Sequence, residues 1–305
     1  MKTAVIYCPN HWGLKSGKKK YSEIVSLLDD VLTDYDFVQS ESVDSVERIA
    51  GMMINNGYQT VIVVGGDSAL NNVVNCLMKY DPEVRDQIRL GIIPNGVVND
   101  FASYWGLTKC TLLECVNVIK SGRIKRVDVG CIEYSDKFDK CHRRYFINCI
   151  NIGLVASLQN LRNRTRKIFG SRTLSYLSSA MLIITQRLSY NVNIKINGEE
   201  ISRKIMTICV GNAMGYGQTP SAVPYNGMLD VSIVAPSQIK QFFTGLKLFL
   251  SRRILMHSDV TAFRTQKINV IGAPHAHVAV DGRSVNSIRG GYEINVVPDA
   301  INIII

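Results

Sequence analysis

A short glycine-rich turn contains the residues whose types and order could do chemistry. Gly65-Gly66-Asp67-Ser68 follows the β-branched run Val61–Val64, and a helical apolar pattern begins directly after it. Four β-branched residues bounded by glycines are typical of a buried parallel strand. Asp67 and Ser68 both favour the N-cap position of a helix. Such a turn aims backbone N–H groups at one point, where phosphates bind, but an ordinary strand-to-helix turn has the same pattern.

A second polar loop follows the predicted strand Leu90–Ile93. Pro94 ends this strand, and Gly96 gives the loop a second small residue. Asn99 or Asp100 can cap a short helix that begins here. The spacing by itself favours this capping role over contact with a ligand.

The succession of elements predicts two domains. Strands and helices alternate up to residue 125, which predicts an α/β domain with a doubly wound parallel sheet over 1–125. After Arg126, short β-rich segments dominate, and Asn197-Gly198 is a hairpin turn. This change predicts an antiparallel β-sandwich domain over 126–305, with helical insertions at about 154–188 and 237–253. Its expected strands are Arg144–Ile152, Val192–Ile196, Lys204–Val210, Leu229–Val234, Lys267–Ile271, His277–Val280, Tyr292–Val297 and Ile301–Ile305.

Composition limits the partners and the compartment. A net charge of +10 attracts nucleic acid, anionic membranes or phosphorylated ligands. We expect no nucleic-acid partner, because no helix-turn-helix, zinc-finger or RNA-recognition signature is present. The sequence contains no run of about 18 apolar residues, so we expect no membrane-spanning helix. The eight cysteines form no C-x-x-C pair, which favours reduced thiols in a cytoplasmic protein.

One basic segment suggests where an anionic membrane could bind. The run Arg162–Arg172 is rich in arginine and precedes the Leu- and Met-rich segment Leu174–Leu188. A basic cluster beside an apolar helix suits peripheral contact with anionic lipid at the inner membrane face. A solvated loop before a packed helix explains the same pattern, so both interpretations stay open.

The glycine-rich turn resembles a motif of the diacylglycerol kinase catalytic family, which reads Gly-Gly-Asp-Gly-Thr-x-x-Glu-Val-x-Asn-Gly. The first three residues match. This chain has Ser68, Ala69, Asn72 and Cys76 where the family has Gly, Thr, Glu and the final Gly. If position 68 requires a positive φ, its side chain would cost about 1–2 kcal/mol.

The second loop resembles the family motif Pro-x-Gly-Thr-x-Asn-Asp-Phe-Ala. Six positions match, and Val97 replaces the Thr. Later landmarks follow in the family order across nearly the whole chain. They are Val127-Asp128-Val129-Gly130, Gly211–Ala222, Pro224–Val231 and Asp281-Gly282-Arg283.

The resemblance implies an ATP-dependent lipid kinase with the fold shared by NAD kinases and diacylglycerol kinases. It implies ATP and Mg²⁺ as cofactors, a lipid such as diacylglycerol as substrate, and an active site in a cleft between the domains. The implied nucleotide-binding residues are Gly65, Gly66, Asp67, Ser68, Pro94, Gly96, Asn99 and Asp100. Asp281 or Asp67 is implied as the catalytic base, and Asp128 as a metal ligand. A homodimer is left open.

The departures from the family pattern favour weak activity and a second hypothesis. Ala69 and Val97 each lose a hydroxyl donor, and Asn226 replaces an Asp. Arg283 replaces an acid and stays protonated, so it cannot act as a base. The alternative is therefore a kinase-fold protein that binds nucleotide or anionic lipid without phosphoryl transfer. NAD kinase, which shares Gly-Gly-Asp, ranks last because the chain has no Asn-Glu dipeptide.

Overall fold

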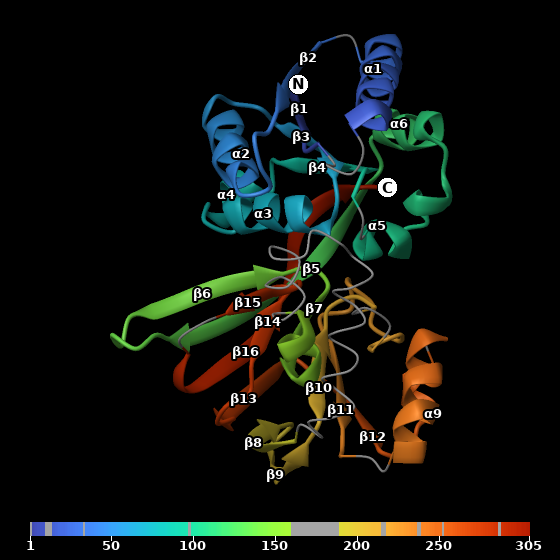
Figure 1. Ribbon diagram of the computed structural model, residues 1–305. Helices are drawn as coiled ribbons and strands as arrows, with labels where there is room; N and C mark the ends of the chain where they lie inside the picture. The colour runs from blue at the N-terminus through green and yellow to red at the C-terminus, as the bar shows by residue number, and fades with distance from the viewer. Residues whose placement is uncertain are drawn as a thin grey trace. The chain divides into compact units, whose positions relative to one another are not determined.

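The computed structural model divides the chain into two compact units (Figure 1). One unit comprises Met1–Val129 with Pro298–Ile305, and the other Gly130–Val297. The structure describes residues 2–9, 14–32, 34–96, 99–159, 189–214, 218–236, 239–251, 253–285 and 288–305. Within these residues, no helix is both long and apolar enough to cross a membrane.

The first unit is built on a parallel sheet with the strand order β2-β1-β3-β4-β16. Its strands are β1 (Thr3–Tyr7), β2 (Tyr35–Gln39), β3 (Thr60–Gly65), β4 (Arg89–Pro94) and the end of β16 (Arg289–Ile304). Its helices are α1 (Leu14–Val31), α2 (Ser45–Asn55), α3 (Asp67–Leu77), α4 (Pro82–Arg85), α5 (Asp100–Tyr104), the 3₁₀ helix η1 (Leu107–Lys109) and α6 (Leu112–Ser121). Helices α2 and α3 lie on one side of the strands, and α1 and α6 on the other (Figure 1). This is the predicted doubly wound α/β arrangement.

The core of this sheet follows from its composition. Strand β3 is buried along its whole length, and Val61–Val64 are at most 1% exposed. A central parallel strand is covered on both faces, so it needs apolar residues at every position rather than at alternate ones. Helix α2 places Val46, Ile49 and Ala50 against the core.

The C-terminal segment belongs to the first unit. Asn302 and Ile303 of β16 pair in parallel with Arg89 and Leu90 of β4. The sequence-based division assigned all of 126–305 to the second domain, whereas the structure places Pro298–Ile305 with the first. A β-branched run shows that a strand forms, but not which sheet that strand joins.

The second unit contains antiparallel sheets packed around one apolar core. One sheet has the strand order β12-β11-β10-β7-β14-β15. Its strands are β7 (Cys149–Gly153), β10 (Thr207–Gly211), β11 (Leu229–Val234), β12 (Val260–Thr265), β14 (Val278–Val280) and β15 (Arg283–Val285). Further antiparallel pairs join β8 (Tyr190–Ile196) to β9 (Glu199–Ile205) and to β13 (Lys267–Gly272), β13 to β16, and β5 (Ile124–Ser135) to β6 (Cys141–Phe146).

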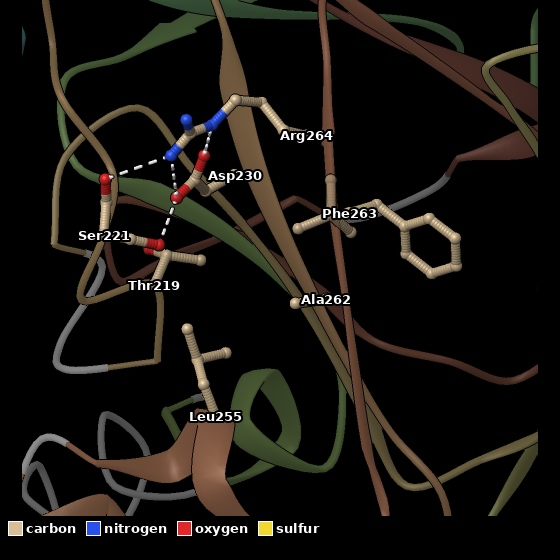
Figure 2. Close-up of a pocket in the computed structure, with 8 residues that line it drawn as sticks. Thr219, Ser221, Asp230, Leu255, Ala262, Phe263 and Arg264 are labelled. Carbon is tan, nitrogen blue, oxygen red and sulfur yellow. Dashed lines mark hydrogen bonds and ion pairs between the residues drawn. The ribbon is translucent and has the colours of Figure 1, made fainter.

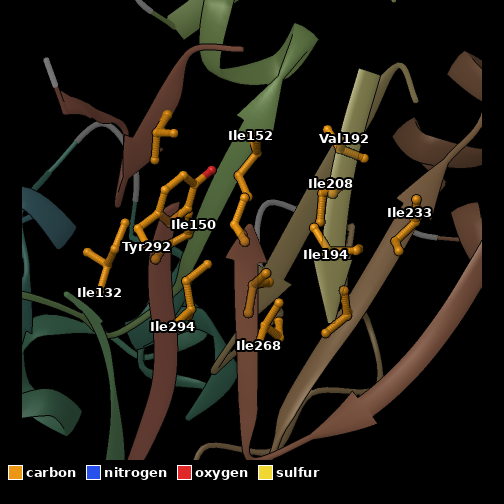
Figure 3. Close-up of a cluster of buried hydrophobic side chains, with 14 of the residues drawn as sticks. Ile132, Ile150, Ile152, Val192, Ile194, Ile208, Ile233, Ile268, Tyr292 and Ile294 are labelled. Atoms are coloured by element: carbon orange, nitrogen blue, oxygen red, sulfur yellow. The ribbon is translucent and has the colours of Figure 1, made fainter. Parts of the chain in front are cut away.

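Side chains from both sheets meet in the sandwich core (Figure 3). Ile150, Ile208 and Ile233 come from one sheet, and Ile194 and Ile268 from the other. Strands that cover a core on one face need alternating apolar residues, as in Tyr190–Ile196. The predicted antiparallel sandwich is therefore confirmed.

Several predicted strands differ from the observed ones. Arg144–Ile152 forms two strands, β6 and β7, with a turn at Ile147 and Asn148. Lys204–Val210 is likewise divided into β9 and β10, whereas the last two predicted strands merge into β16. Neither of these two divisions is marked by Gly or Pro, so the local composition does not reveal them. Asn197-Gly198 is the predicted hairpin turn, with φ values of 52° and 87°.

The predicted helical insertions are described in part. Helix α9 (Ile239–Leu250) occupies most of the second insertion, and the 3₁₀ helix η3 (Ile254–Met256) follows directly after it. The first insertion is helical over 154–159. The basic run Arg162–Arg172 and the segment Leu174–Leu188 lie outside the described residues.

Candidate functional site

The glycine-rich turn joins β3 to α3, but its residues take other roles than predicted. Gly66 is the N-cap of α3 and Asp67 is the first helical residue, so neither Asp67 nor Ser68 caps this helix. Ser68 is exposed in the first turn and does not have a positive φ. The backbone penalty considered for its side chain therefore does not arise.

Gly65 and Gly96 are required by close contacts. A Cβ at Gly65 would lie 2.9 Å from the Cβ of Ala69. A Cβ at Gly96, in the second loop, would lie only 2.3 Å from the Gly66 Cα. Neither Gly65 nor Gly96 has a positive φ. The two predicted nucleotide-binding loops therefore touch backbone to backbone.

Asp67 joins the two loops through its carboxylate. The side chain is buried, and it accepts hydrogen bonds from the backbone N–H of Asp100 at 2.8 Å and of Phe101 at 3.3 Å. These N–H groups belong to the first turn of helix α5. Backbone N–H groups in the first turn of a helix have no carbonyl partner within that helix. Asn99 is the N-cap residue of α5, as predicted, but its side chain does not cap the helix N–H groups. A carboxylate from another helix does so instead.

The Asn99 side chain closes the second loop. Its Oδ1 accepts from the Gly96 N–H at 3.0 Å, and its Nδ2 donates to the Gly96 carbonyl at 2.9 Å. Pro94 lies opposite Gly65 in the β3–β4 register, and the Asn95 N–H donates to the Gly65 carbonyl at 2.9 Å. The predicted nucleotide-binding residues thus form one cluster at the carboxyl ends of β3 and β4. Val97 and Val98 lie outside the described residues.

This cluster has the position in the fold that anion sites commonly take. The N-terminus of α3, an eleven-residue helix, lies at the carboxyl end of the parallel sheet, next to α5. In open α/β sheets, ligands bind at this edge, and helix N-termini favour phosphate there.

Asp281 holds a turn in the second unit. It lies in the two-residue loop between β14 and β15, where Asp281 and Gly282 have φ values of 44° and 77°. Two successive positive φ values identify a type I′ turn, for which Asp-Gly is a preferred sequence. The Asp281 carboxylate accepts three backbone N–H bonds of 2.8–3.0 Å, from residues 147, 148 and 149.

The same contacts set the protonation of Asp281. Burial raises the pKa of the Asp281 carboxyl from 3.8 to about 6, although the three N–H groups act in the opposite direction. A carboxyl with a pKa near neutrality can exchange a proton at physiological pH.

Asp128 and Arg283 are the other two predicted site residues. Asp128 is buried in the first unit, and its Oδ1 accepts from the Asp299 N–H at 2.9 Å. It therefore anchors the returning C-terminal segment. Arg283 is the first residue of β15, directly after the Asp281 turn, and it is half-buried opposite Val280.

The predicted Mg²⁺ ligands do not form a complete protein site within either unit. Among the described residues, no three His, Cys, Asp or Glu side chains lie close enough together to hold a metal ion. Mg²⁺ in kinases is commonly held by one or two carboxylates together with substrate phosphates. The role of Asp128 as a metal ligand stays a prediction.

Sequence reasoning missed buried polar residues around the Asp281 turn. The Asn148 carbonyl accepts from the N–H groups of Asn212 and Ala213, and Asn212 Nδ2 donates to the Ile147 carbonyl at 3.1 Å. Asn148 and Asn212 are fully buried. The signal was an asparagine inside an apolar run, although neither polar atom of the Asn148 side chain has a hydrogen-bond partner among the described residues.

A second missed group is the ion pair of Asp230 and Arg264 on neighbouring strands of the second unit. Arg264 Nε lies 2.7 Å from Asp230 Oδ1. Asp230 belongs to the Leu-Asp-Val landmark, but the sequence alone assigned it no partner. Asn226, in the same segment, accepts from the Met228 N–H at 3.0 Å and stabilises a local turn.

Comparisons with known proteins agree with this architecture. Residues 2–132 match the "Diacylglycerol kinase catalytic domain" family, and residues 148–305 match the "YegS C-terminal NAD kinase beta sandwich-like domain" family. A Staphylococcus aureus (strain MSSA476) protein named "Putative lipid kinase SAS0691" is 23% identical over 316 residues, covering 98% of this chain and 96% of that protein.

Solved structures show the same fold. The "putative diacylglycerol kinase from Bacillus anthracis str. Sterne" has a TM-score of 0.73 and 19% identity, covering 99% of this chain and 96% of that one. Yeast NADH kinase in complex with NADH has a TM-score of 0.53 and 11% identity, covering 99% and 82%. The chain therefore belongs to the diacylglycerol kinase catalytic-domain family, with the YegS-type β-sandwich as its second half.

Proposed function

We propose that this protein is an ATP-dependent lipid kinase with weak activity, acting on the hydroxyl of a lipid such as diacylglycerol. The observation that carries this proposal is the contact between the two glycine-containing loops, fixed by the Asp67 carboxylate on the N–H groups of Asp100 and Phe101. Phosphoryl transfer depends mainly on positioning and electrostatic stabilisation of the phosphates, and preformed loops supply both.

The nucleotide-binding role rests on backbone rather than on side chains. Gly65, Gly66 and Gly96 let the loops approach within contact distance, and Asn99 fixes the position of Gly96. Ser68 is exposed at the start of α3 and could offer its hydroxyl to a phosphate. Pro94 and Asp100 mark the two ends of the second loop. We propose that these residues surround the ATP phosphates, which would bring Mg²⁺ with them.

Asp281 is the stronger candidate for the general base. Its pKa of about 6 lies near the pH at which the enzyme would work. The three backbone bonds hold the carboxylate in one orientation. Asp67 likewise accepts two backbone hydrogen bonds and stays the alternative candidate for the base.

The second candidate function is binding without phosphoryl transfer. Arg283 favours it, because its guanidinium directly follows the Asp281 turn, where family members have an acid. An acid at this position could assist a base, whereas Arg283 would attract the phosphate of a bound lipid or nucleotide.

Transfer of labelled phosphate from ATP with Mg²⁺ to a lipid panel tests the proposal. Slow but protein-dependent phosphorylation of diacylglycerol, lost in Asp281→Ala, is the expected result. An ATP-induced rise in melting temperature without any transfer would instead establish the binding function. Contact with anionic membrane through Arg162–Arg172, and a homodimer, remain part of the proposal.

A further inference from the structure

The second unit contains a pocket of about 250 Å³ beside strands β11 and β12 (Figure 2). Thr219 and Ser221 line it from the segment before β11, and Leu255 from η3. Asp230 of β11 and Ala262 and Arg264 of β12 also line the pocket. None of these residues belongs to the predicted nucleotide-binding or catalytic set.

Arg264 is held at the pocket in one orientation. Its Nε lies 2.7 Å from Asp230 Oδ1, and its Nη2 lies 3.2 Å from Asp230 Oδ2 and 3.4 Å from the Ser221 carbonyl. The Ser221 hydroxyl also donates to Asp230 Oδ2, at 2.5 Å. Asp230 is only 6% exposed, so the ion pair is built into the fold.

One end of this guanidinium is left for a ligand. No acceptor in the described part of the chain takes a hydrogen bond from Arg264 Nη1, and the side chain is 49% exposed. A guanidinium that is already oriented loses little freedom when it binds an anion, because its planar donors match carboxylate and phosphate oxygens.

The opposite part of the pocket is apolar. The Leu255 side chain extends from η3 toward Thr219 (Figure 2). Ala262 adds only a methyl group, whereas the Phe263 ring points to the other side of β12 and packs against the sandwich core. Ser232 lies opposite Ala262 in the β11–β12 register and is 1% exposed. Its Oγ has no hydrogen-bond partner within the described residues, so the face of β11 that carries Asp230 also holds a buried hydroxyl without a partner.

The chain segment that carries Leu255 is cationic. Between Val231 and Ser258 the sequence contains no Asp or Glu. Its cations are Lys240, Lys247, Arg252 and Arg253. Lys247 and Arg253 are exposed, and Met256, next to Leu255, is 73% exposed. A cationic segment with exposed apolar surface attracts molecules that join an anionic group to a hydrocarbon chain.

We propose that this pocket binds a single-chain anionic amphiphile. Its carboxylate or phosphate would accept hydrogen bonds from Arg264 Nη1, and its chain would lie against Leu255 and Ala262. The pocket is smaller than the common ligand pocket of about 300–1,000 Å³, which favours one chain over two. This site is separate from the proposed kinase residues and does not depend on kinase activity.

Calorimetric titration of the full chain tests the proposal with four probes below their micellar concentrations. Dodecanoate represents a fatty acid, and a lysophosphatidic acid represents a single-chain phospholipid. Dodecanol and dodecyltrimethylammonium are the neutral and cationic controls. Saturable binding of at least one anion, at least about tenfold tighter than the cation, is expected, since an ionic hydrogen bond gives about 1.4 kcal/mol or more. The stronger of the two anions identifies the source of the ligand.

Variants assign the binding to the pocket. Ala262→Phe fills the pocket but keeps the Arg264–Asp230 pair, so it should weaken anion binding about tenfold or more. Ala262→Leu is the milder filler if the larger one unfolds. Arg264→Gln should remove the preference for anions over dodecanol. Arg289→Gln, which removes an exposed arginine elsewhere in the second unit, is the matched control and should leave amphiphile binding unchanged.

Three results would overturn the proposal. The first is anion binding of undiminished affinity in folded Ala262→Phe or Ala262→Leu. The second is a cation that binds wild type as tightly as either anion. The third is the absence of saturable binding by both anions. The ATP-induced change in melting temperature is measured on the same samples, so failure of the kinase proposal is recorded separately.

Discussion

The Asp67 carboxylate accepts the backbone N–H of Asp100 at 2.8 Å, across 33 positions of sequence. This bond joins the start of α3 to the start of α5, and it holds the two predicted nucleotide-binding loops against each other. Asp67, which the family resemblance implies as a possible catalytic base, thus also positions the two loops.

Replacing Asp67 should therefore affect stability and ligand binding together. Asp67→Ala leaves two buried or half-buried N–H groups without their acceptor, which costs about 1–3 kcal/mol. We expect a lower melting temperature and a smaller ATP-induced increase. Asp81→Ala is the control, because Asp81 is an exposed N-cap without a side-chain cap bond. Equal ATP-induced shifts in both variants would contradict the positioning role.

The contact between Gly66 and Gly96 predicts a second sensitive position. A methyl group at Gly96 would lie 2.3 Å from the Gly66 Cα, so Gly96→Ala must displace one loop. ATP should then no longer raise the melting temperature, as measured by thermal denaturation with and without ATP and Mg²⁺. Gly272→Ala is the matched control, since it meets no atom within 4 Å and needs no positive φ. Normal ATP stabilisation in Gly96→Ala would show that the close approach is not needed for binding.

The pKa of Asp281 predicts how stability depends on pH. The folded-state pKa is raised from 3.8 to about 6, so the folded protein binds this proton more tightly than the unfolded chain does. The free energy of unfolding should therefore fall as pH rises from about 4 to about 6, and the loss is complete above that range. Urea denaturation between pH 4 and 7 measures this dependence. It should be weaker in Asp281→Asn, and an unchanged profile would mean that another group titrates.

If Asp281 is the general base, the rate of catalysis should depend on pH. The base must be deprotonated, so kcat/KM for lipid phosphorylation should rise as pH passes through about 6. Asp281→Asn should lower kcat strongly at every pH. Circular dichroism of the same sample shows whether the variant is folded. A folded variant that keeps wild-type kcat would exclude Asp281 as the base.

Arg283 distinguishes a weak kinase from a protein that only binds. Arg283→Glu restores the charge found in the family, and we expect it to raise phosphoryl transfer to diacylglycerol. Arg289→Glu reverses an exposed charge in the same unit and is the control. Transfer from labelled ATP is measured for both. Activity that falls in Arg283→Glu would assign the guanidinium a direct role in holding phosphate.

The sequence by itself determines much of the local structure of this protein. Val61–Val64 predicted the buried central strand, because only β-branched residues on both faces suit a strand covered twice. Asn197-Gly198 predicted its hairpin turn, because both residues tolerate positive φ. The glycine-rich turn and the second loop were also found locally, since each depends on neighbours a few residues away.

The partners of the charged side chains were decided by the tertiary structure. Asp67 could have capped its own helix, but the fold brings the N-terminus of α5 to it. Asp281 binds backbone groups more than 130 positions earlier in the chain, and Asp230 finds Arg264 on the next strand. A carboxylate accepts any N–H within reach, so its residue type cannot specify which one. Only the packing of the strands brings one particular donor within 3 Å and excludes water from it.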